Sequence, residues 1–219
     1  RNWEREHLAD MRVAAAGAST TQRFAPAETT SSDPELAAWA PVFEIDAQGP
    51  FDRFGTPGWN EAGALDVRGD RPVVFHRRTQ TLVQGRLLQQ LVYTLWFPER
   101  PARGAFDLLA GRLDGVIVRL TLAPDGTPWM LDTIHACGCY HLFFPAAGVQ
   151  LRPGAPDDEE WAFVAAPLPA FAPGTRPLVR LSSGAHQVLA VGATASITTT
   201  ARYALREEAD LRRLPLPGG

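Results

Sequence analysis

Short apolar segments rich in Val, Ile, Leu, Thr and aromatic residues recur along most of this chain, and Gly, Pro, Asp and Asn separate them. Segments of this length and composition, bounded by turn-forming residues, are typical of β-strands. The predicted strands cover residues 42–45, 73–79, 88–97, 115–122, 128–134, 139–144, 163–165, 178–182, 187–191 and 196–205. Because helical patterns are few, the sequence predicts a mainly β protein that folds as an antiparallel β-sandwich or barrel.

The beginning of the chain differs from the rest. Residues 3–15 predict a short amphipathic helix, and residues 17–32, rich in Ala, Ser, Thr and Pro, predict an extended linker or surface arm. A second short helix is predicted to start with either Ser32 or Asp33 as its N-cap and to end near Trp39.

We therefore divide the chain into a helical and extended N-terminal arm, residues 1–40, and a β domain, residues 41–219. We expect the arm to contact a partner domain or subunit. The chain begins at Arg1, and residues 214–219, Leu-Pro-Leu-Pro-Gly-Gly, are typical of the entry to a further segment.

Composition excludes several classes of function. A net charge of −3 gives no basic surface of the kind that binds nucleic acid, so no nucleic-acid partner is expected. All 21 positions that hold lysine or arginine hold arginine, which excludes lysine-based mechanisms. No apolar run approaches the roughly 20 residues of a membrane-spanning helix, so no membrane span is predicted. No feature indicates which small molecule would be a substrate.

Both cysteines lie in one segment, His135-Ala136-Cys137-Gly138-Cys139-Tyr140-His141, which follows the clearest predicted hairpin turn, residues 123–126. Because side chains alternate along a strand, the sequence predicts that the two cysteines and the two histidines point the same way, while the other face is apolar. Two thiols and two imidazoles together indicate metal binding, a disulfide or nucleophilic chemistry.

The leading interpretation is a metal site. Thiolates and imidazoles suit zinc, copper and iron, so a transition metal is the expected cofactor. Four alternate residues on a straight strand span about 20 Å and cannot all reach one ion, but a bend at Gly138 would relieve this. The predicted ligands are Cys137 and Cys139 with one or both of His135 and His141, joined by His186 as a distant ligand or proton-transfer partner.

Other interpretations of the segment are open. A Cys137–Cys139 disulfide requires a bent Gly138, and such a strained bond would be easily reduced and therefore redox-active rather than stabilising. Both cysteines could instead be buried as small apolar residues. A cysteine thiolate activated by His135 or His141 could also act as a nucleophile.

Several charged residues lie near these positions. Asp107, Asp114 and Asp132 stand near predicted turns or beside the segment, where Asp132 is a candidate to fix an imidazole tautomer or, equally, to stabilise a turn. Glu99 and Arg100 form either a solvated pair or a charged clamp for an anionic group.

Three motifs give the chain a resemblance to a family of uncharacterised bacterial proteins. They are residues 93–101, Tyr-Thr-Leu-Trp-Phe-Pro-Glu-Arg-Pro; residues 111–115, Gly-Arg-Leu-Asp-Gly; and residues 135–141, His-Ala-Cys-Gly-Cys-Tyr-His. The similarity covers residues 89–145 and continues to residues 211–215. The resemblance implies a chain that runs on further, and it carries over no activity, cofactor or active site.

Together these observations favour a metal-binding β protein, an oxidoreductase or a metal-handling protein, with its Cys/His site at residues 135–141. One alternative is a non-enzymatic binding or assembly module in which the Cys-Gly-Cys unit is structural. A second alternative is a cysteine-dependent enzyme.

Overall fold

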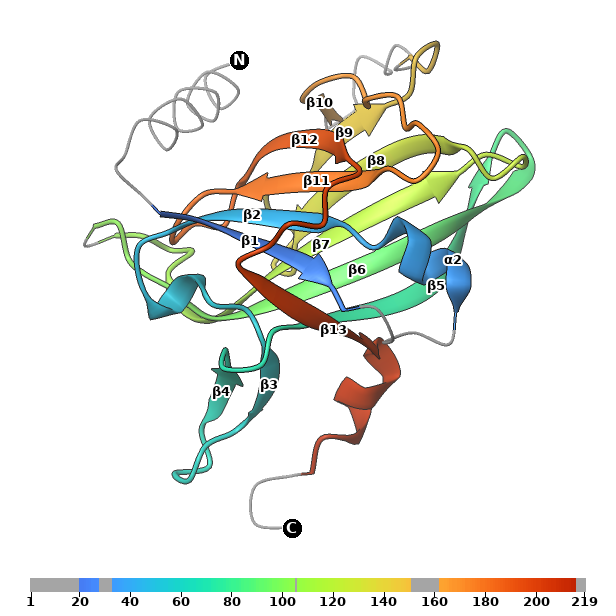
Figure 1. Ribbon diagram of the computed structural model, residues 1–219. Helices are drawn as coiled ribbons and strands as arrows, with labels where there is room; N and C mark the ends of the chain where they lie inside the picture. Colours follow the sequence, from blue (N-terminus) through green and yellow to red (C-terminus); the bar gives the residue numbers. More distant parts are fainter. Residues whose placement is uncertain (1–19, 28–32, 105, 151–161, 216–219) are drawn as a thin grey trace.

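The computed structural model describes residues 20–27, 33–104, 106–150 and 162–215. It is mainly β, with 52% strand and 8% helix, and this confirms the predicted fold class. One large sheet curls into a half-barrel, and a small second sheet, β3–β4, lies apart from it (Figure 1). No helix in the described ranges is long and apolar enough to cross a membrane.

The elements follow one another along the chain in a simple order. They are β1 (Thr20–Pro26), α2 (Pro34–Trp39), β2 (Val42–Ala47), η1 (Pro50–Asp52), β3 (Thr56–Trp59), β4 (Leu65–Arg68), β5 (Val73–Val83), β6 (Arg86–Arg100), β7 (Gly111–Leu122), β8 (Pro128–His135), β9 (Leu142–Pro145), β10 (Phe163–Val164), β11 (Arg176–Leu181), β12 (Val188–Thr194), β13 (Ala201–Glu207) and η2 (Glu208–Arg213).

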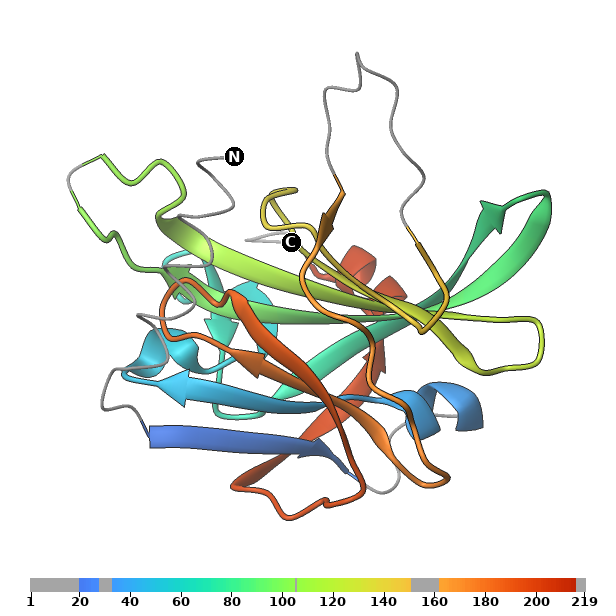
Figure 2. The same ribbon diagram turned by 90° about the horizontal axis from the view of Figure 1, so that it is seen from above.

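The large sheet is mixed. Its strand order is β10-β9-β8-β7-β6-β5-β13-β1-β2-β11-β12. The predicted antiparallel pairing holds from β5 to β9, whereas β13 pairs in parallel with β1 and β5, β11 with β2, and β10 with β9. Long strands twist, so the sheet curls until β1, β2, β11 and β12 face β6, β7 and β8 across the interior (Figure 2).

Most predicted strands coincide with observed ones, but the one over residues 139–144 does not. β8 ends at His135 and β9 begins at Leu142, so residues 136–141 form the connection between them. The strands β3 and β4 were not predicted, because Pro57 and Gly58 weaken the strand signal in β3.

β1 corrects the predicted N-terminal arm. Residues 20–26, predicted as part of an extended linker, form a strand that is hydrogen-bonded to β2 and β13 inside the sheet. The second predicted helix is confirmed as α2: Asp33 Oδ1 accepts from Glu35 N–H and Leu36 N–H at 3.0 and 3.1 Å, which makes Asp33 the N-cap. The helix predicted over residues 3–15 lies outside the described residues.

The apolar core fills the inside of the curled sheet. Its largest members come from both sides of the half-barrel and include the fully buried Phe43, Tyr93 and Tyr203. Both tyrosine hydroxyls donate to backbone carbonyls, Tyr93 to Leu36 at 2.8 Å and Tyr203 to Pro41 at 2.6 Å. These bonds satisfy two buried polar groups and fix α2 and the start of β2 over the core.

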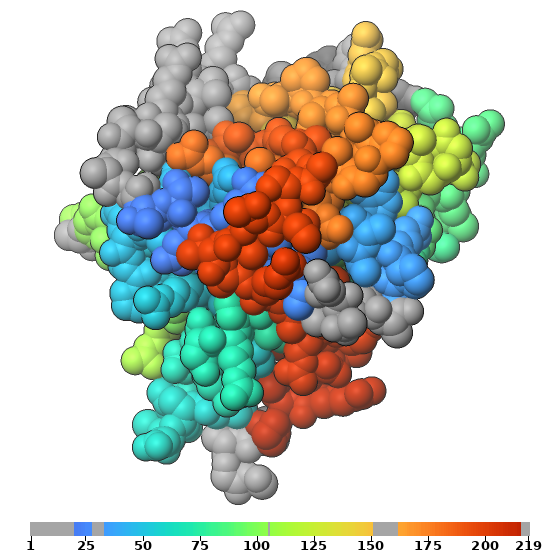
Figure 3. Space-filling model, in the orientation of Figure 1, coloured from blue at the N-terminus to red at the C-terminus, as the bar shows by residue number. Residues whose placement is uncertain are grey.

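The C-terminal ends of four strands lie together at one edge of the half-barrel. β2, β6, β8 and β11 run in the same direction around the sheet, so their C-terminal ends meet at one edge, which we call the C-terminal rim. The β6–β7 connection, at the left in Figure 1, marks this rim. The face shown in Figure 3 is formed largely by β11–β13, with β1 and β2 on one side and α2 on the other.

Candidate functional site

Alternating imidazole and carboxylate groups lie buried at the C-terminal rim. His186, in the turn between β11 and β12, is fully buried, and its Nδ1 is 2.7 Å from Asp114 Oδ2. Its Nε2 is 3.3 Å from Asp52 Oδ1. The ring of Phe97 stacks on the His186 ring, with 3.7 Å between centroids and 9° between planes. His186 is therefore held between two carboxylates and an aromatic face.

A second imidazole shares the Asp114 carboxylate. Nδ1 of His135, the last residue of β8, is 3.3 Å from Asp114 Oδ1, and the Gly115 N–H donates to the same oxygen at 2.9 Å. An ionised carboxylate only accepts hydrogen bonds, so the tautomer of His135 that fits this contact is the one with the proton on Nδ1. Asp52, His186, Asp114 and His135 thus form a continuous series, which we call the His–Asp chain.

The carboxylates of the His–Asp chain favour their ionised form. Burial raises the pKa of Asp114, but hydrogen bonds to His135 and His186 outweigh it and hold that pKa well below its usual range. Burial likewise raises the pKa of Asp52, but the neighbouring His186 imidazole and hydrogen bonds from backbone amides lower it overall. Burial lowers the pKa of His186, but the hydrogen bond to Asp114 and the neighbouring Asp52 carboxylate raise it above its ordinary value.

The pKa shifts of Asp52, Asp114 and His186 predict how the stability of the fold changes with pH. The free energy of unfolding should decrease as pH rises above about 6.5, because the raised pKa of His186 stabilises the fold only while its imidazole is protonated. It should also decrease as pH falls below about 4, because the lowered pKa values of Asp52 and Asp114 require their carboxylates to be ionised. Urea unfolding over roughly pH 3 to 9 measures both limbs.

His186→Gln is the control for the alkaline limb. It removes the titrating imidazole and leaves both carboxylates with their other hydrogen bonds, so the decrease above about pH 6.5 should become shallower while a weaker acid limb remains. An alkaline limb of unchanged slope in this variant would contradict the assignment to His186.

Backbone strain is concentrated around the His–Asp chain. Four non-glycine residues in the described ranges have positive φ, and three of them lie here: Leu113 at 66°, Tyr140 at 54° and His186 at 50°. Residues other than glycine rarely adopt this left-handed backbone conformation, and it persists where the surroundings enforce it, often at functional sites. Leu113 precedes Asp114 and Tyr140 follows Cys139. The strained backbone is therefore adjacent to a carboxylate and to a thiol, two groups that take part in chemical reactions. We therefore take this rim as the candidate functional site.

The Cys-Gly-Cys unit lies in the turn between β8 and β9. His135 N–H donates to the Cys139 carbonyl at 2.9 Å, and Gly138 N–H donates to the His135 carbonyl at 2.8 Å. Gly138 has φ of 87°, so the chain reverses here. The prediction that His135, Cys137, Cys139 and His141 alternate along one face of a strand is therefore wrong.

The two cysteines lie in the same turn and differ in exposure. Cys137 is exposed and Cys139 is half-buried, and no disulfide joins them in this structure. A hydrogen bond with Cys137, together with burial, raises the pKa of Cys139; Arg100 opposes the rise and Asp114 adds to it. The interpretation of both cysteines as buried apolar residues does not hold for Cys137.

Tyr140 connects the turn to β6. Arg100 Nη2 donates to Tyr140 Oη at 3.3 Å, and the guanidinium carbon lies 5.4 Å from the tyrosine ring centroid. The Tyr140 ring also approaches His135, with 5.1 Å between ring centroids. Because successive strand residues point to opposite faces, Arg100 is buried against Tyr140 while Glu99 is exposed. Neither predicted role for a Glu99–Arg100 pair fits this arrangement.

His141 belongs to a separate ion cluster. Its Nε2 is 3.0 Å from Asp132 Oδ2, and Arg119 Nε donates to the same oxygen at 2.8 Å. Arg119 on β7 lies opposite Asp132 on β8 across the strand pair. Asp132 thus has an imidazole partner, as predicted, and that partner is His141.

The predicted metal ligands do not converge on one point. His135 and His186 face one carboxylate and His141 faces another, whereas Cys137 and Cys139 face each other. In the part of the chain that the structure describes, no group of three or more His, Cys, Asp or Glu side chains is placed to hold a metal ion. Binding of zinc, copper or iron here stays a prediction.

Sequence reasoning missed Asp52 and gave Asp114 only a turn role. A weak signal exists for each. Asp114 precedes Gly115, where an added Cβ would lie 2.8 Å from the Trp96 ring and 2.9 Å from Ala136 Cβ, so the backbone needs glycine there. Asp52 ends a Gly-Pro-Phe-Asp run, a pattern that is also common in ordinary turns.

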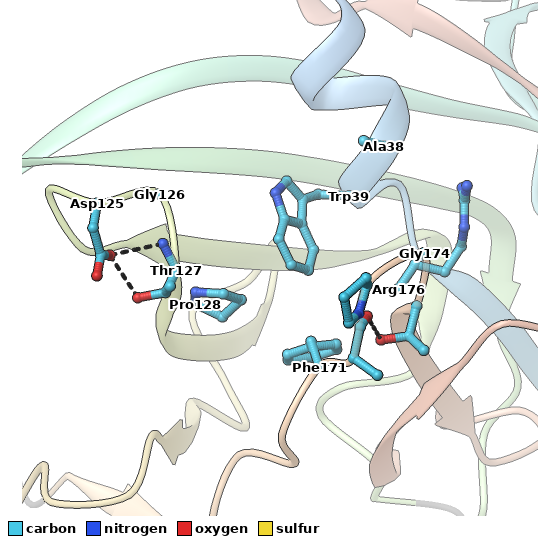
Figure 4. A pocket seen from close by; sticks show the side chains of 12 residues that line it. Ala38, Trp39, Asp125, Gly126, Thr127, Pro128, Phe171, Gly174 and Arg176 are labelled. Atoms are coloured by element: carbon cyan, nitrogen blue, oxygen red, sulfur yellow. Dashed lines mark hydrogen bonds between the residues drawn. The ribbon is translucent and has the colours of Figure 1, made fainter.

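A pocket of about 440 Å³ lies at the opposite rim, beside the β7–β8 hairpin (Figure 4). Trp39 and Phe171 form its apolar wall, with 5.4 Å between ring centroids. Its polar groups are already engaged: Asp125 accepts from Thr127, and Arg176 donates to the carbonyls of Ala37 and Ala40. The pocket is therefore a hollow with an apolar wall, and its polar side chains are already engaged in hydrogen bonds within the protein.

No family model, no curated protein and no solved structure matches this chain. The resemblance of residues 89–145 to a family of bacterial proteins therefore stays a prediction.

Proposed function

We propose that the protein is a thiol–disulfide oxidoreductase whose reactive group is the Cys137–Cys139 dithiol. The observation that carries this proposal is the reversal of the chain at Gly138, which places the two cysteines on either side of one tight turn. In an extended chain, cysteines separated by one residue lie at the upper limit of disulfide distance, and a bend brings them within reach. Of the interpretations left open by the sequence, the redox-active pair has the strongest geometric support.

The two cysteines differ in exposure, and the two steps of exchange use this difference. Cys137 is exposed and can attack one sulfur of a substrate disulfide, which forms a mixed disulfide and releases one substrate thiolate. Cys139 then loses its proton and attacks the Cys137 sulfur, which closes the internal disulfide and releases the second substrate thiolate. Two electrons pass from the dithiol to the substrate disulfide, and the two thiol protons end on the released thiolates. The raised pKa of Cys139 fits the later step.

The small ring decides which direction of exchange is easier. Excess substrate disulfide drives the steps above as written, whereas a substrate dithiol drives them in reverse and readily reduces the strained internal disulfide. A disulfide closed across Gly138 alone is strained, and strained disulfides have higher reduction potentials than structural ones, which lie below about −300 mV. We expect a potential of roughly −230 to −180 mV, in the range of proteins that donate or exchange disulfides.

A polypeptide is the expected substrate. The β6–β7 connection at the same rim carries Phe106 and Leu108, whose side chains are 95% and 96% exposed. Large apolar side chains on a protein surface favour contact with other polypeptides. Their position fits a partner chain that brings its cystine to the dithiol turn.

Single serine variants should separate the two steps of exchange. With glutathione disulfide, the wild-type chain should form an internal disulfide, whereas Cys139→Ser should stop at a mixed disulfide with glutathione. Cys137→Ser should react at least about tenfold more slowly, because the remaining thiol is half-buried and has a raised pKa. Intact mass after acid quenching distinguishes these products, and the double serine variant is the control for non-covalent glutathione.

Metal content of the same purified chain tests the rival functions. Near-stoichiometric zinc, copper or iron with both thiols masked would contradict exchange and support the metal site predicted from the sequence. Metal-free thiols that fail to equilibrate with glutathione, in a chain that both serine variants merely destabilise, would instead favour the assembly module.

A further inference from the structure

We propose that Asp114 is a positioning residue for the dithiol: its carboxylate fixes His135, the residue that closes the Cys137–Cys139 turn, and thereby keeps Cys139 aligned to resolve the mixed disulfide. This inference rests on the thiol–disulfide function proposed above. It concerns the second step of exchange, in which one internal thiol must reach the other.

The turn depends on His135 at both of its ends. The His135 N–H donates to the Cys139 carbonyl, and the His135 carbonyl accepts from Gly138 N–H, so one residue holds both hydrogen bonds of the turn. Any rotation of His135 about its backbone therefore moves Cys139 relative to Cys137. Because Gly138 and Tyr140 both have positive φ, the turn has an uncommon shape that its surroundings must maintain.

The His135 ring is held chiefly by Asp114. Its Nδ1 faces Asp114 Oδ1 at 3.3 Å, while its Nε2 is buried and has no hydrogen-bond partner among the described residues. The ring also packs against Tyr140. Without the carboxylate, the imidazole would lose its one polar contact, and the turn would lose its link to the buried part of the rim.

The carboxylate is itself rigidly placed. Asp114 Oδ1 accepts from Gly115 N–H, and Oδ2 is 2.7 Å from Nδ1 of His186. His186 in turn lies between Asp52 and the Phe97 ring. The His–Asp chain therefore connects the turn to three other elements of the rim, which is the arrangement that holds a reactive group in one geometry.

The charge of Asp114 acts against its positioning role, because it disfavours the Cys139 thiolate that resolution requires. The groups that face Cys139 are Cys137 in the same turn, Arg100 at the end of β6 and Asp114 near the start of β7. The negative carboxylate opposes formation of a Cys139 thiolate, and Arg100 partly compensates. Asp114→Asn removes this charge effect, which alone would speed resolution, so slower resolution in that variant reports lost positioning.

Asp114→Asn tests this inference, with Asp132→Asn as its matched control. Both carboxylates are buried and pair with a histidine beside the turn, but only Asp114 contacts His135. In quenched reactions of the full chain with glutathione disulfide, Asp114→Asn should slow resolution of the mixed disulfide about tenfold and leave the initial attack by Cys137 within about twofold. Asp132→Asn should leave both steps within about twofold of the wild-type rates.

Each other outcome overturns the inference. Unchanged resolution in Asp114→Asn, or equal slowing in both variants, would remove the specific role of Asp114. General loosening of the fold would accelerate reaction of both thiols rather than slow only resolution. If the wild-type chain forms no mixed or internal disulfide, the proposed function fails and this inference fails with it; if the wild type exchanges normally, only the inference is at stake.

Two further measurements apply even if Asp114→Asn does not fold. His135→Ala removes the ring and leaves the Asp114–His186 contact, and it should show the same slowed resolution. In the wild-type chain, ¹⁵N NMR should find the His135 imidazole protonated on Nδ1. Protonation on Nε2 alone would contradict the contact with Asp114 on which the inference depends.

Discussion

Replacing Asp52 by alanine should lower the free energy of unfolding by about 3–5 kcal/mol. The carboxylate is fully buried and accepts four hydrogen bonds, from the amides of Gln48, Gly49 and Gly184 and from the hydroxyl of Ser183. It also faces the imidazole of His186. The alanine variant would leave these four part-buried donors without their acceptor and the buried His186 without its neighbouring carboxylate, and the loss of such partners is costly.

Asp70→Ala is the control for Asp52→Ala. Asp70 is exposed, and its substitution should change the free energy of unfolding by no more than about 0.5 kcal/mol. Urea unfolding at neutral pH measures both variants. A loss below about 1 kcal/mol in Asp52→Ala would show that water replaces the carboxylate and that the His–Asp chain does not fix the rim.

The local parts of the fold were predictable from the sequence because their signals are local. The β7–β8 hairpin is an example: Gly126 has φ of 82°, and Ala123 and Thr127 close the turn, as the Pro-Asp-Gly pattern indicates. The parallel contacts were not predictable in this way. Phe24 lies beside Ala201 in the β1–β13 pair, and no local pattern specifies a pairing between residues so distant in sequence.

β1 shows why composition misleads at a strand. Its sequence, Thr-Thr-Gln-Arg-Phe-Ala-Pro, follows an Ala- and Ser-rich stretch and reads as a linker. Only the last three residues of the strand are buried, and two of those, Ala25 and Pro26, carry no strong strand preference. Burial between two neighbouring strands outweighs propensity here.

The candidate site was predicted in part. The sequence located the two thiols, and it named His186 as the distant residue to accompany them. In the structure the Asp114 carboxylate lies between the imidazoles of His135 and His186 and contacts both. The sequence could not reveal that carboxylate as a bridge, because its role depends on the β7 start, the β8 end and the β11–β12 turn meeting at one rim.

The Cys-Gly-Cys turn shows the limit of periodicity. Alternation of His and Cys matched a strand, but hydrogen bonds from His135 to Cys139 and from Gly138 to His135 reverse the chain. Alternation describes only which residues would share a face if the backbone stayed extended. A glycine between two reactive residues was the available sign that it does not, and the positive φ of Tyr140 gave no sign at all.

Phe54→Ala should have an effect as large as Asp52→Ala, through packing rather than hydrogen bonding. Phe54 follows η1, is fully buried, and places its ring 4.8 Å from that of Phe24, 6.1 Å from that of Phe97 and 6.2 Å from that of Tyr203. These partners lie on β1, β6 and β13, so a single ring joins both sides of the half-barrel. Removing it leaves a cavity and should lower the free energy of unfolding by about 3–5 kcal/mol, as urea unfolding would measure.

The chain offers a matched control in Phe106→Ala, because Phe106 is 95% exposed and its loss should change the free energy of unfolding by less than about 0.5 kcal/mol. Phe54→Leu should lie between the two, at about 1–1.5 kcal/mol, since it keeps most of the apolar volume. Phe97 contacts both Phe54 and His186, so Phe54→Ala should also make the pH dependence assigned to His186 shallower. Equal destabilisation by Phe54→Ala and Phe106→Ala would contradict the placement of Phe54 at the centre of the core.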